Sequence, residues 1–155
     1  MVMVPSNNAA AKGGSWFDAV PLLVIPLIVY NFLAFGGKML SSVEGVQARL
    51  VAPAMQIPMP SDAVWAVSWG DLFIVLSLIL LFVEIIRSTG IGKGAIINHG
   101  VSMVVFIACV VQFLLFDVFA TSAFFLLTLM TLLDVVAGFV ISIVTARRDF
   151  AVGGG

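Results

Sequence analysis

The stretch TLMTLLDVVAGFVISIVTARRDF, residues 128–150, decides the fold class of this 155-residue chain. Most of its side chains are aliphatic or aromatic, and it closes on the charged segment ARRDF. At about 1.5 Å per residue, such a helix is long enough to cross the roughly 30 Å hydrocarbon core of a bilayer. One carboxylate, Asp134, interrupts it at a depth where water is absent.

The composition of the whole chain agrees with a membrane environment. Hydrophobic residues make up 62% of the chain and charged residues only 10%, whereas soluble domains carry about 25% charged residues. A chain of this size folded in water buries only about two thirds of its surface, so lipid must be the solvent. The net charge of −1 argues against a nucleic-acid partner.

Four apolar runs predict four transmembrane helices, at about residues 17–37, 66–88, 94–116 and 119–146. The predicted fold is all-α: a polytopic integral membrane protein built as an antiparallel four-helix transmembrane bundle. The chain is treated as a single membrane domain, residues 1–155. It starts with a mobile tail at residues 1–15 and ends with a cytoplasmic tail at residues 147–155.

One external loop, residues 38–65, connects the first two predicted spans. Its segment SSVEGVQARLVA predicts a short amphipathic helix that ends at Pro53. The following PAMQIPMPSD has too many prolines for a helix or a central strand, so extended chain is expected. Its apolar Met55, Ile57 and Met59 predict that this segment lies against the bundle.

Positive charges near the span ends predict the orientation. One side holds Lys38 and Arg49, and the other holds Lys12, Arg87, Lys93, Arg147 and Arg148. Both termini are therefore predicted to be cytoplasmic, and the short loops suggest a bacterial inner membrane. Contacts with lipid headgroups are expected from Arg87, Lys93, Arg147 and Arg148.

Polar residues gather on one face of each predicted span, because each helical residue advances by 100°. The last span carries such a stripe at Thr128, Thr131, Asp134, Gly138, Ser142 and Thr145. The preceding spans carry stripes at Asn98, His99, Ser102, Cys109 and Gln112, and at Ser77, Glu84 and Ser88. These faces are predicted to turn inward, with hydroxyl groups bonding across to neighbouring helices.

Depth along the helices separates the polar residues into two levels. Asp134, Gln112 and Asn31 are expected to meet near mid-membrane, with Thr131 on the same face as Asp134. Glu84 and His99 both lie about one turn inside the cytoplasmic boundary, which makes a Glu84–His99 pair reasonable. Arg87, three residues after Glu84, is a competing partner.

Asp134 allows two interpretations. No Lys or Arg lies in the apolar core beside it, and burial without a cation disfavours the charged form, so we predict a largely protonated side chain. A protonated Asp134 can join helices or subunits as a hydrogen-bond donor. The alternative is that it carries protons or cations, the default hypothesis for an acid inside the membrane.

The leading functional hypothesis is a small non-enzymatic multi-pass protein, an accessory or assembly subunit that associates with itself or with a larger membrane complex. The first alternative is a proton- or cation-linked transporter or channel subunit that uses Asp134. The second is a membrane enzyme that uses Glu84 and His99. No nucleophile–base arrangement appears, and a lone His is a weak metal signal. No catalytic residue, metal or cofactor is therefore expected.

Overall fold

The structure is a computed structural model that describes residues 20–40, 42–88 and 93–152, with side chains at 20–40, 42–88 and 97–144. Its elements are α1 (Val24–Leu40), α2 (Val43–Val51), β1 (Pro53–Pro58), β2 (Val64–Ser68), α3 (Trp69–Arg87), α4 (Lys93–Leu115), the 3-10 helix η2 (Asp117–Phe119) and α5 (Ser122–Val152). The fold is mostly helical, as predicted, but the all-α prediction missed its two-stranded sheet.

Three helices of the described chain are long and apolar enough to cross a membrane. The qualifying segments are Trp69–Arg87 of α3, Ile97–Leu115 of α4 and Ser122–Val144 of α5. The fourth predicted span, α1, is a shorter apolar helix of 17 residues. These helices indicate an integral membrane protein.

The beginning of α1 differs from the prediction. Residues 20–23 form a bend and a turn, so the helix begins at Val24 rather than near residue 17. Pro21 supplies no backbone donor, and the residue before a proline is disfavoured in a helix. The helix is therefore about 26 Å long. The predicted tail at residues 1–15 lies outside the described residues.

Two further boundaries shift for local reasons. Ser68 caps α3: its hydroxyl accepts from Asp71 N at 3.1 Å, and the Asp71 carboxylate accepts from Ser68 N at 2.8 Å. This reciprocal capping box fixes the helix start at Trp69 instead of residue 66. At the other end of the chain, α5 continues to Val152, so much of the predicted tail 147–155 is helical.

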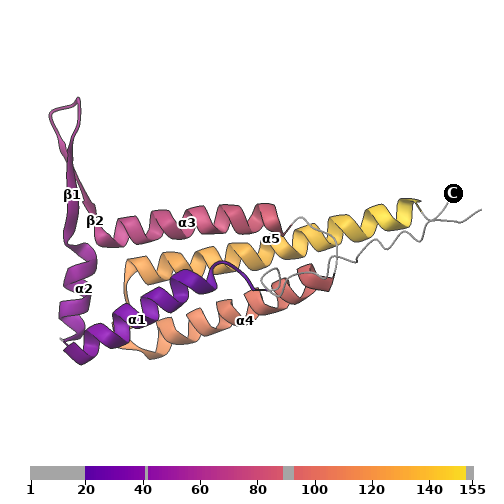
Figure 1. Cartoon of the computed structure of the whole chain (residues 1–155), viewed down its shortest axis with the longest axis horizontal. Helices are drawn as coiled ribbons and strands as arrows, with labels where there is room; N and C mark the ends of the chain where they lie inside the picture. The colour runs from indigo at the N-terminus through magenta and orange to yellow at the C-terminus, as the bar shows by residue number, and fades with distance from the viewer. Residues whose placement is uncertain (1–19, 41, 89–92, 153–155) are drawn as a thin grey trace, which may run out of the picture.

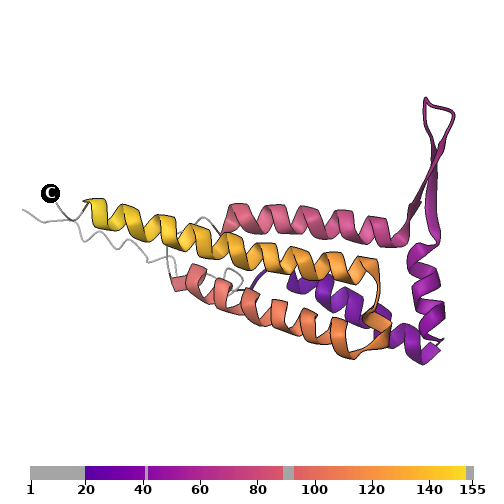
Figure 2. The same ribbon diagram turned by 180° about the vertical axis from the view of Figure 1, so that it is seen from behind.

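Helices α1, α3, α4 and α5 lie alongside one another, and α2 crosses the end where α1 stops and α3 starts (Figure 1). Figure 2 shows the same arrangement from behind. Helix α5 packs against α4, α3 and α1. Near α2, the rings of Tyr30, Phe119 and Phe124 form an aromatic core with centroids 4.7–5.6 Å apart. The Tyr30 hydroxyl also bonds to Thr121, which joins α1 to the start of α5.

Lys38 near the end of α1 contacts η2. Its Nζ lies 3.2 Å from Asp117 Oδ1, and the same oxygen accepts from Val118 N at 2.8 Å. The Lys38 hydrogen bond, above all, holds the pKa of the exposed Asp117 carboxyl below its usual range. The contact fastens the end of α1 over the turn between α4 and α5.

The segment after α2 forms an antiparallel hairpin, with Met55 opposite Val67 and Ile57 opposite Trp65. The prediction that it lies against the helices is wrong: it projects beyond α3 (Figure 1), and Met55 is 46% exposed. A bond from Met59 N to Ala63 O closes the turn at 2.8 Å. The prolines are tolerated because they lie at the ends of β1, in a sheet with free outer edges.

Two glycines let α2 approach its neighbours closely. A Cβ on Gly37 of α1 would lie 2.6 Å from Cγ2 of Val46, and one on Gly70 of α3 would lie 3.0 Å from the Leu50 carbonyl oxygen. Because neither glycine has a side chain, α2 packs tightly on both α1 and α3.

We expect Gly37→Ala to destabilise the protein, because the stiff β-branched Val46 cannot easily move aside. Overpacking costs about 1–3 kcal/mol, which outweighs the roughly 0.5–1 kcal/mol gained when a helical glycine becomes alanine. Thermal unfolding in mild detergent measures the effect. Gly36→Ala is the matched control, since a Cβ there meets nothing within 4 Å. Equal melting temperatures for the two variants would contradict the tight contact, and adding Val46→Ala to Gly37→Ala should restore stability.

Candidate functional site

Helices α4 and α5 run antiparallel, and their contacts define which residues face one another. The rings of Phe113 and Phe125 are 5.6 Å apart, and Cys109 faces Thr131. Further along the pair, Asp134 lies beside Ser102. The two residue numbers in these pairs add to a nearly constant value, as expected for antiparallel helices in one register.

This register separates Asp134 from the residues expected around it. Asn31 and Gln112 do meet: Gln112 Nε2 donates to Asn31 Oδ1 at 2.9 Å, and Asn31 Nδ2 donates to Gln112 Oε1 at 3.3 Å. Asp134, however, is level with Ser102, about 15 Å along α4 from Gln112. Asn31 and Gln112 therefore meet as predicted, but the prediction that Asp134 joins them is wrong.

Glu84 of α3 contacts three other polar groups near the ends of the helices opposite α2. It is fully buried. Its Oε1 accepts from Asn98 Nδ2 at 2.6 Å, and its Oε2 accepts from Leu22 N at 2.9 Å. The Arg87 guanidinium lies 3.4 Å from Oε2 and donates to the Val20 carbonyl at 2.6 Å. One carboxylate thus joins α3, α4 and the turn that leads into α1.

The expected Glu84–His99 pair is replaced by a Glu84–Asn98 hydrogen bond. Successive residues of a helix point about 100° apart, so a helix that directs Asn98 toward α3 directs His99 elsewhere. The His99 ring packs over Gly138 of α5, where an added Cβ would lie 2.6 Å from its Cε1. The competing partner, Arg87, does contact Glu84.

Asp134 is buried between the same helices. Only 3% of it is exposed, and Glu84, His99 and Arg87 lie within electrostatic range of its carboxyl group. Two neighbouring buried oxygens, Ser102 Oγ and Asn98 Oδ1, have no hydrogen-bond partner of good geometry among the described residues. We refer to Glu84, Arg87, Asn98, His99, Ser102 and Asp134 as the polar cluster.

The hydroxyl groups of the polar stripes mostly bond within their own helices. Thr131 donates to the Thr128 carbonyl at 2.7 Å, Thr128 to that of Phe124 at 2.9 Å, and Ser142 to that of Gly138 at 2.9 Å. The expectation of hydroxyl bonds across to other helices is therefore wrong for Thr128 and Ser142, whereas the Thr131 hydroxyl also faces Cys109 of α4. Such backbone bonds satisfy a buried hydroxyl without any interhelical partner.

The residues expected at lipid headgroups are described only in part. The side chains of Lys93, Arg147 and Arg148 lie outside the described set, although their backbones belong to α4 and α5. Arg87 turns to Glu84 and to the Val20 carbonyl. The sequence predicts that Asn98 and Ser102 lie on a polar helix face, but it does not predict that they form a site. Their spacing of one helical turn is the feature that could have indicated it.

Within the described residues, no group of three or more His, Cys, Asp or Glu side chains could hold a metal ion. No protein-family model, curated protein or solved structure matches the chain. The polar cluster must therefore be interpreted from its own geometry.

Replacement of Glu84 by leucine should destabilise the protein, because Asn98 Nδ2 and Leu22 N would lose their acceptors. Each buried donor left unsatisfied costs about 1–3 kcal/mol. Thermal unfolding in detergent should show a clear drop for Glu84→Leu and a much smaller change for Glu44→Gln, which alters an exposed acid on α2.

A double-mutant cycle with Asn98→Leu separates the specific bond from general disruption. We expect the second substitution to cost much less in the Glu84→Leu background than alone. Strictly additive effects would show that the 2.6 Å contact contributes nothing to folding.

Proposed function

We propose that the chain is a small non-enzymatic multi-pass membrane protein that acts as an accessory or assembly subunit, associating with copies of itself or with a larger membrane complex. In this proposal α1 is the fourth span, which completes an antiparallel four-helix bundle. The apolar character of α1 and its position alongside α3, α4 and α5 support this assignment (Figure 1). The positive residues favour cytoplasmic termini.

The hairpin is the part of the chain that we propose contacts the partner. Its cross-strand pairs Met55–Val67 and Ile57–Trp65 place apolar side chains on one face, because residues two apart in a strand share a face. Trp65 is 56% exposed and Ile57 38%. An isolated two-stranded hairpin is marginally stable in water, and exposed apolar surface of this kind marks an interaction site.

The orientation of the hairpin supports a partner that lies beside the protein in the membrane. It extends across the axes of the helices and past α3 (Figures 1 and 2). If the helices cross the bilayer, the hairpin runs along the membrane surface. We infer that its apolar face contacts a neighbouring subunit.

The pair of substitutions Ile57→Ser and Trp65→Ser should weaken assembly, because it removes apolar surface from the contact face. The measurement is the mass of the complex purified in mild detergent. The matched control is Gln56→Ser with Val64→Ser, which alters the opposite face of the same hairpin. We expect the control to assemble as the unmodified protein does and the apolar-face variant to be released as a monomer.

The contact proposal fails if both hairpin variants keep the same assembly as the unmodified protein. It also fails if the apolar-face variant assembles normally and differs only in how its hairpin contacts lipid. That difference would appear as faster protease cleavage of the hairpin when the protein alone is reconstituted in lipid vesicles.

A second function, proton or cation handling, is favoured by one observation. Asp134 is buried beside the Ser102 hydroxyl, and the nearby Asn98 Oδ1 has no hydrogen-bond partner among the described residues. A buried acid next to an unsatisfied oxygen is suited to exchange a proton or to accept an ion. An enzyme using Glu84 and His99 has less support, because both Glu84 oxygens are occupied and His99 packs on Gly138.

Asp134→Asn distinguishes the two functions. The amide keeps the size of the side chain and a hydrogen-bond donor, but it cannot titrate. For an accessory subunit we expect assembly to persist and proton flux into reconstituted vesicles to equal that of protein-free vesicles, with or without the substitution. A flux that requires the unmodified protein and disappears in Asp134→Asn would instead establish proton handling.

A further inference from the structure

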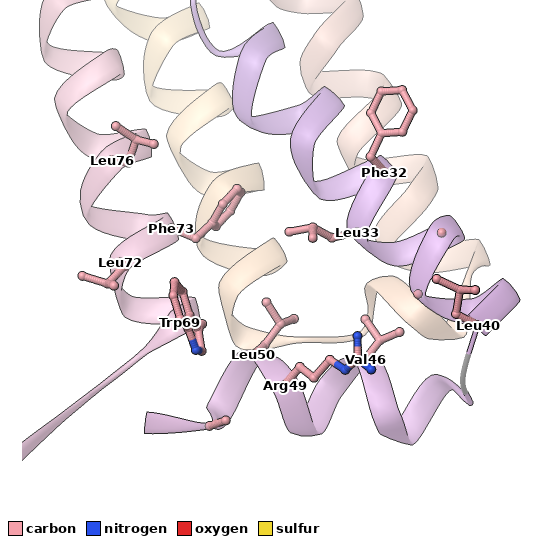
Figure 3. Close-up of a pocket in the computed structure, with 13 residues that line it drawn as sticks. Phe32, Leu33, Leu40, Val46, Arg49, Leu50, Trp69, Leu72, Phe73 and Leu76 are labelled. Carbon is pink, nitrogen blue, oxygen red and sulfur yellow. The ribbon is translucent and has the colours of Figure 1, made fainter. Parts of the chain in front are cut away.

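A large apolar groove separates α1 from α3 at the end of the helices where α2 lies. Its volume is about 710 Å³, within the range of roughly 300–1,000 Å³ that is typical of small-molecule sites. Figure 3 shows Leu33 of α1 and Phe73 of α3 pointing toward one another across it, with Leu50 of α2 below them. Gly36 also lines the groove, and a Cβ there would meet nothing within 4 Å.

The groove exists because α2 holds α1 and α3 apart at this end. Gly37 and Gly70 let α2 pack closely on each of them, so α2 closes the groove at one end. The sides facing away from α5 remain open: Phe32 is 77% exposed and Leu76 57%. Leu76 lies on α3, which is long enough to cross a membrane, so its exposed side faces lipid and the groove opens to the bilayer.

Polar groups occur at the α2 end of the groove. Arg49 of α2 lines it there, with its side chain running along α2 toward Val46 (Figure 3). The Arg49 guanidinium forms no ion pair within the described part of the chain. Trp69, 59% exposed, adds an indole of the kind enriched at membrane interfaces. The groove is therefore cationic at its interfacial end and apolar along its length.

We propose that this groove binds one phospholipid with an anionic headgroup. Its acyl chain lies against Leu33, Phe73 and Leu76, and its phosphate pairs with Arg49. A guanidinium matches phosphate oxygens through paired hydrogen bonds. The cation lies at the interfacial end of the groove and the apolar wall follows it toward the membrane interior. This order matches the headgroup and acyl chain of a lipid in one leaflet.

The depth of the groove favours a lipid over a partner helix. Its lining on α3 is confined to residues 69–76, the first part of a helix that ends at Arg87. Eight residues of helix rise about 12 Å, close to half of the roughly 30 Å hydrocarbon core. A transmembrane helix would need a groove along the whole core, whereas an acyl chain occupies one leaflet.

Lipid titration followed by native mass spectrometry tests the proposal on the detergent-purified full chain. The probes are phosphatidylglycerol, which is anionic, and phosphatidylcholine, which has no net charge. Both lipids carry the phosphate, but the choline ammonium of phosphatidylcholine repels the Arg49 guanidinium. We therefore expect the unmodified protein to bind phosphatidylglycerol about tenfold more tightly, which corresponds to one modest charge interaction. Arg49→Gln should abolish this preference, because it weakens phosphatidylglycerol binding more than phosphatidylcholine binding.

Gly36→Leu tests the cavity itself, since the new side chain enters the groove without meeting protein atoms at its Cβ. We expect at least a tenfold loss of binding for both lipids. Gly100→Leu on α4 is the matched control, because a Cβ there also meets nothing within 4 Å, and it should bind both lipids as the unmodified protein does.

Equal affinity of the unmodified protein for the two lipids would overturn the proposal, as would normal lipid binding by a Gly36→Leu protein that melts normally. Release of a bound protein by Gly36→Leu, without loss of lipid, would show a protein occupant instead. The hairpin substitutions lie outside the groove, so failure of the assembly proposal would leave these lipid measurements unaffected.

Discussion

A carboxylate buried among membrane helices must find every hydrogen-bond partner within the protein. For Glu84, these partners come from several different parts of the chain. Its oxygens gather Asn98 from α4, Arg87 from its own helix and the backbone of Leu22. Leu22 lies in the turn before Val24, where α1 begins. Glu84 therefore fixes the turn that leads into α1 by accepting from its backbone.

Different kinds of side chains pack at the two ends of the helices. At the α2 end, Tyr30, Phe119 and Phe124 form a packed aromatic core, and the close contacts of α2 leave a groove between α1 and α3. At the other end, charged and amide groups form the polar cluster. Helix α5 passes through both regions, with Phe124 in the first and Asp134 in the second.

The sequence predicted what depends on local pattern. The long apolar runs appear as α3, α4 and α5, and the amphipathic pattern appears as α2. Relations between helices were harder to predict. The predicted contact of Asp134 with Gln112 depends on the predicted helix ends, and an error of several residues at those ends changes which residues face one another. Asn98 replaced His99 beside Glu84 because the rotation of α4 about its axis depends on packing along the whole helix. The sequence does not predict the hairpin, because prolines argue against a strand unless they lie at its ends, and the ends of β1 depend on its pairing with β2.

The junction at Ser68 has a mechanical consequence. Ser68 is both the last residue of β2 and the N-cap of α3, so no flexible linker separates the hairpin from the helix. A displacement of the hairpin would therefore move α3 with it. Glu84 lies about 22 Å along the same helix from Trp69, so such a movement would reach the polar cluster at the other end of α3.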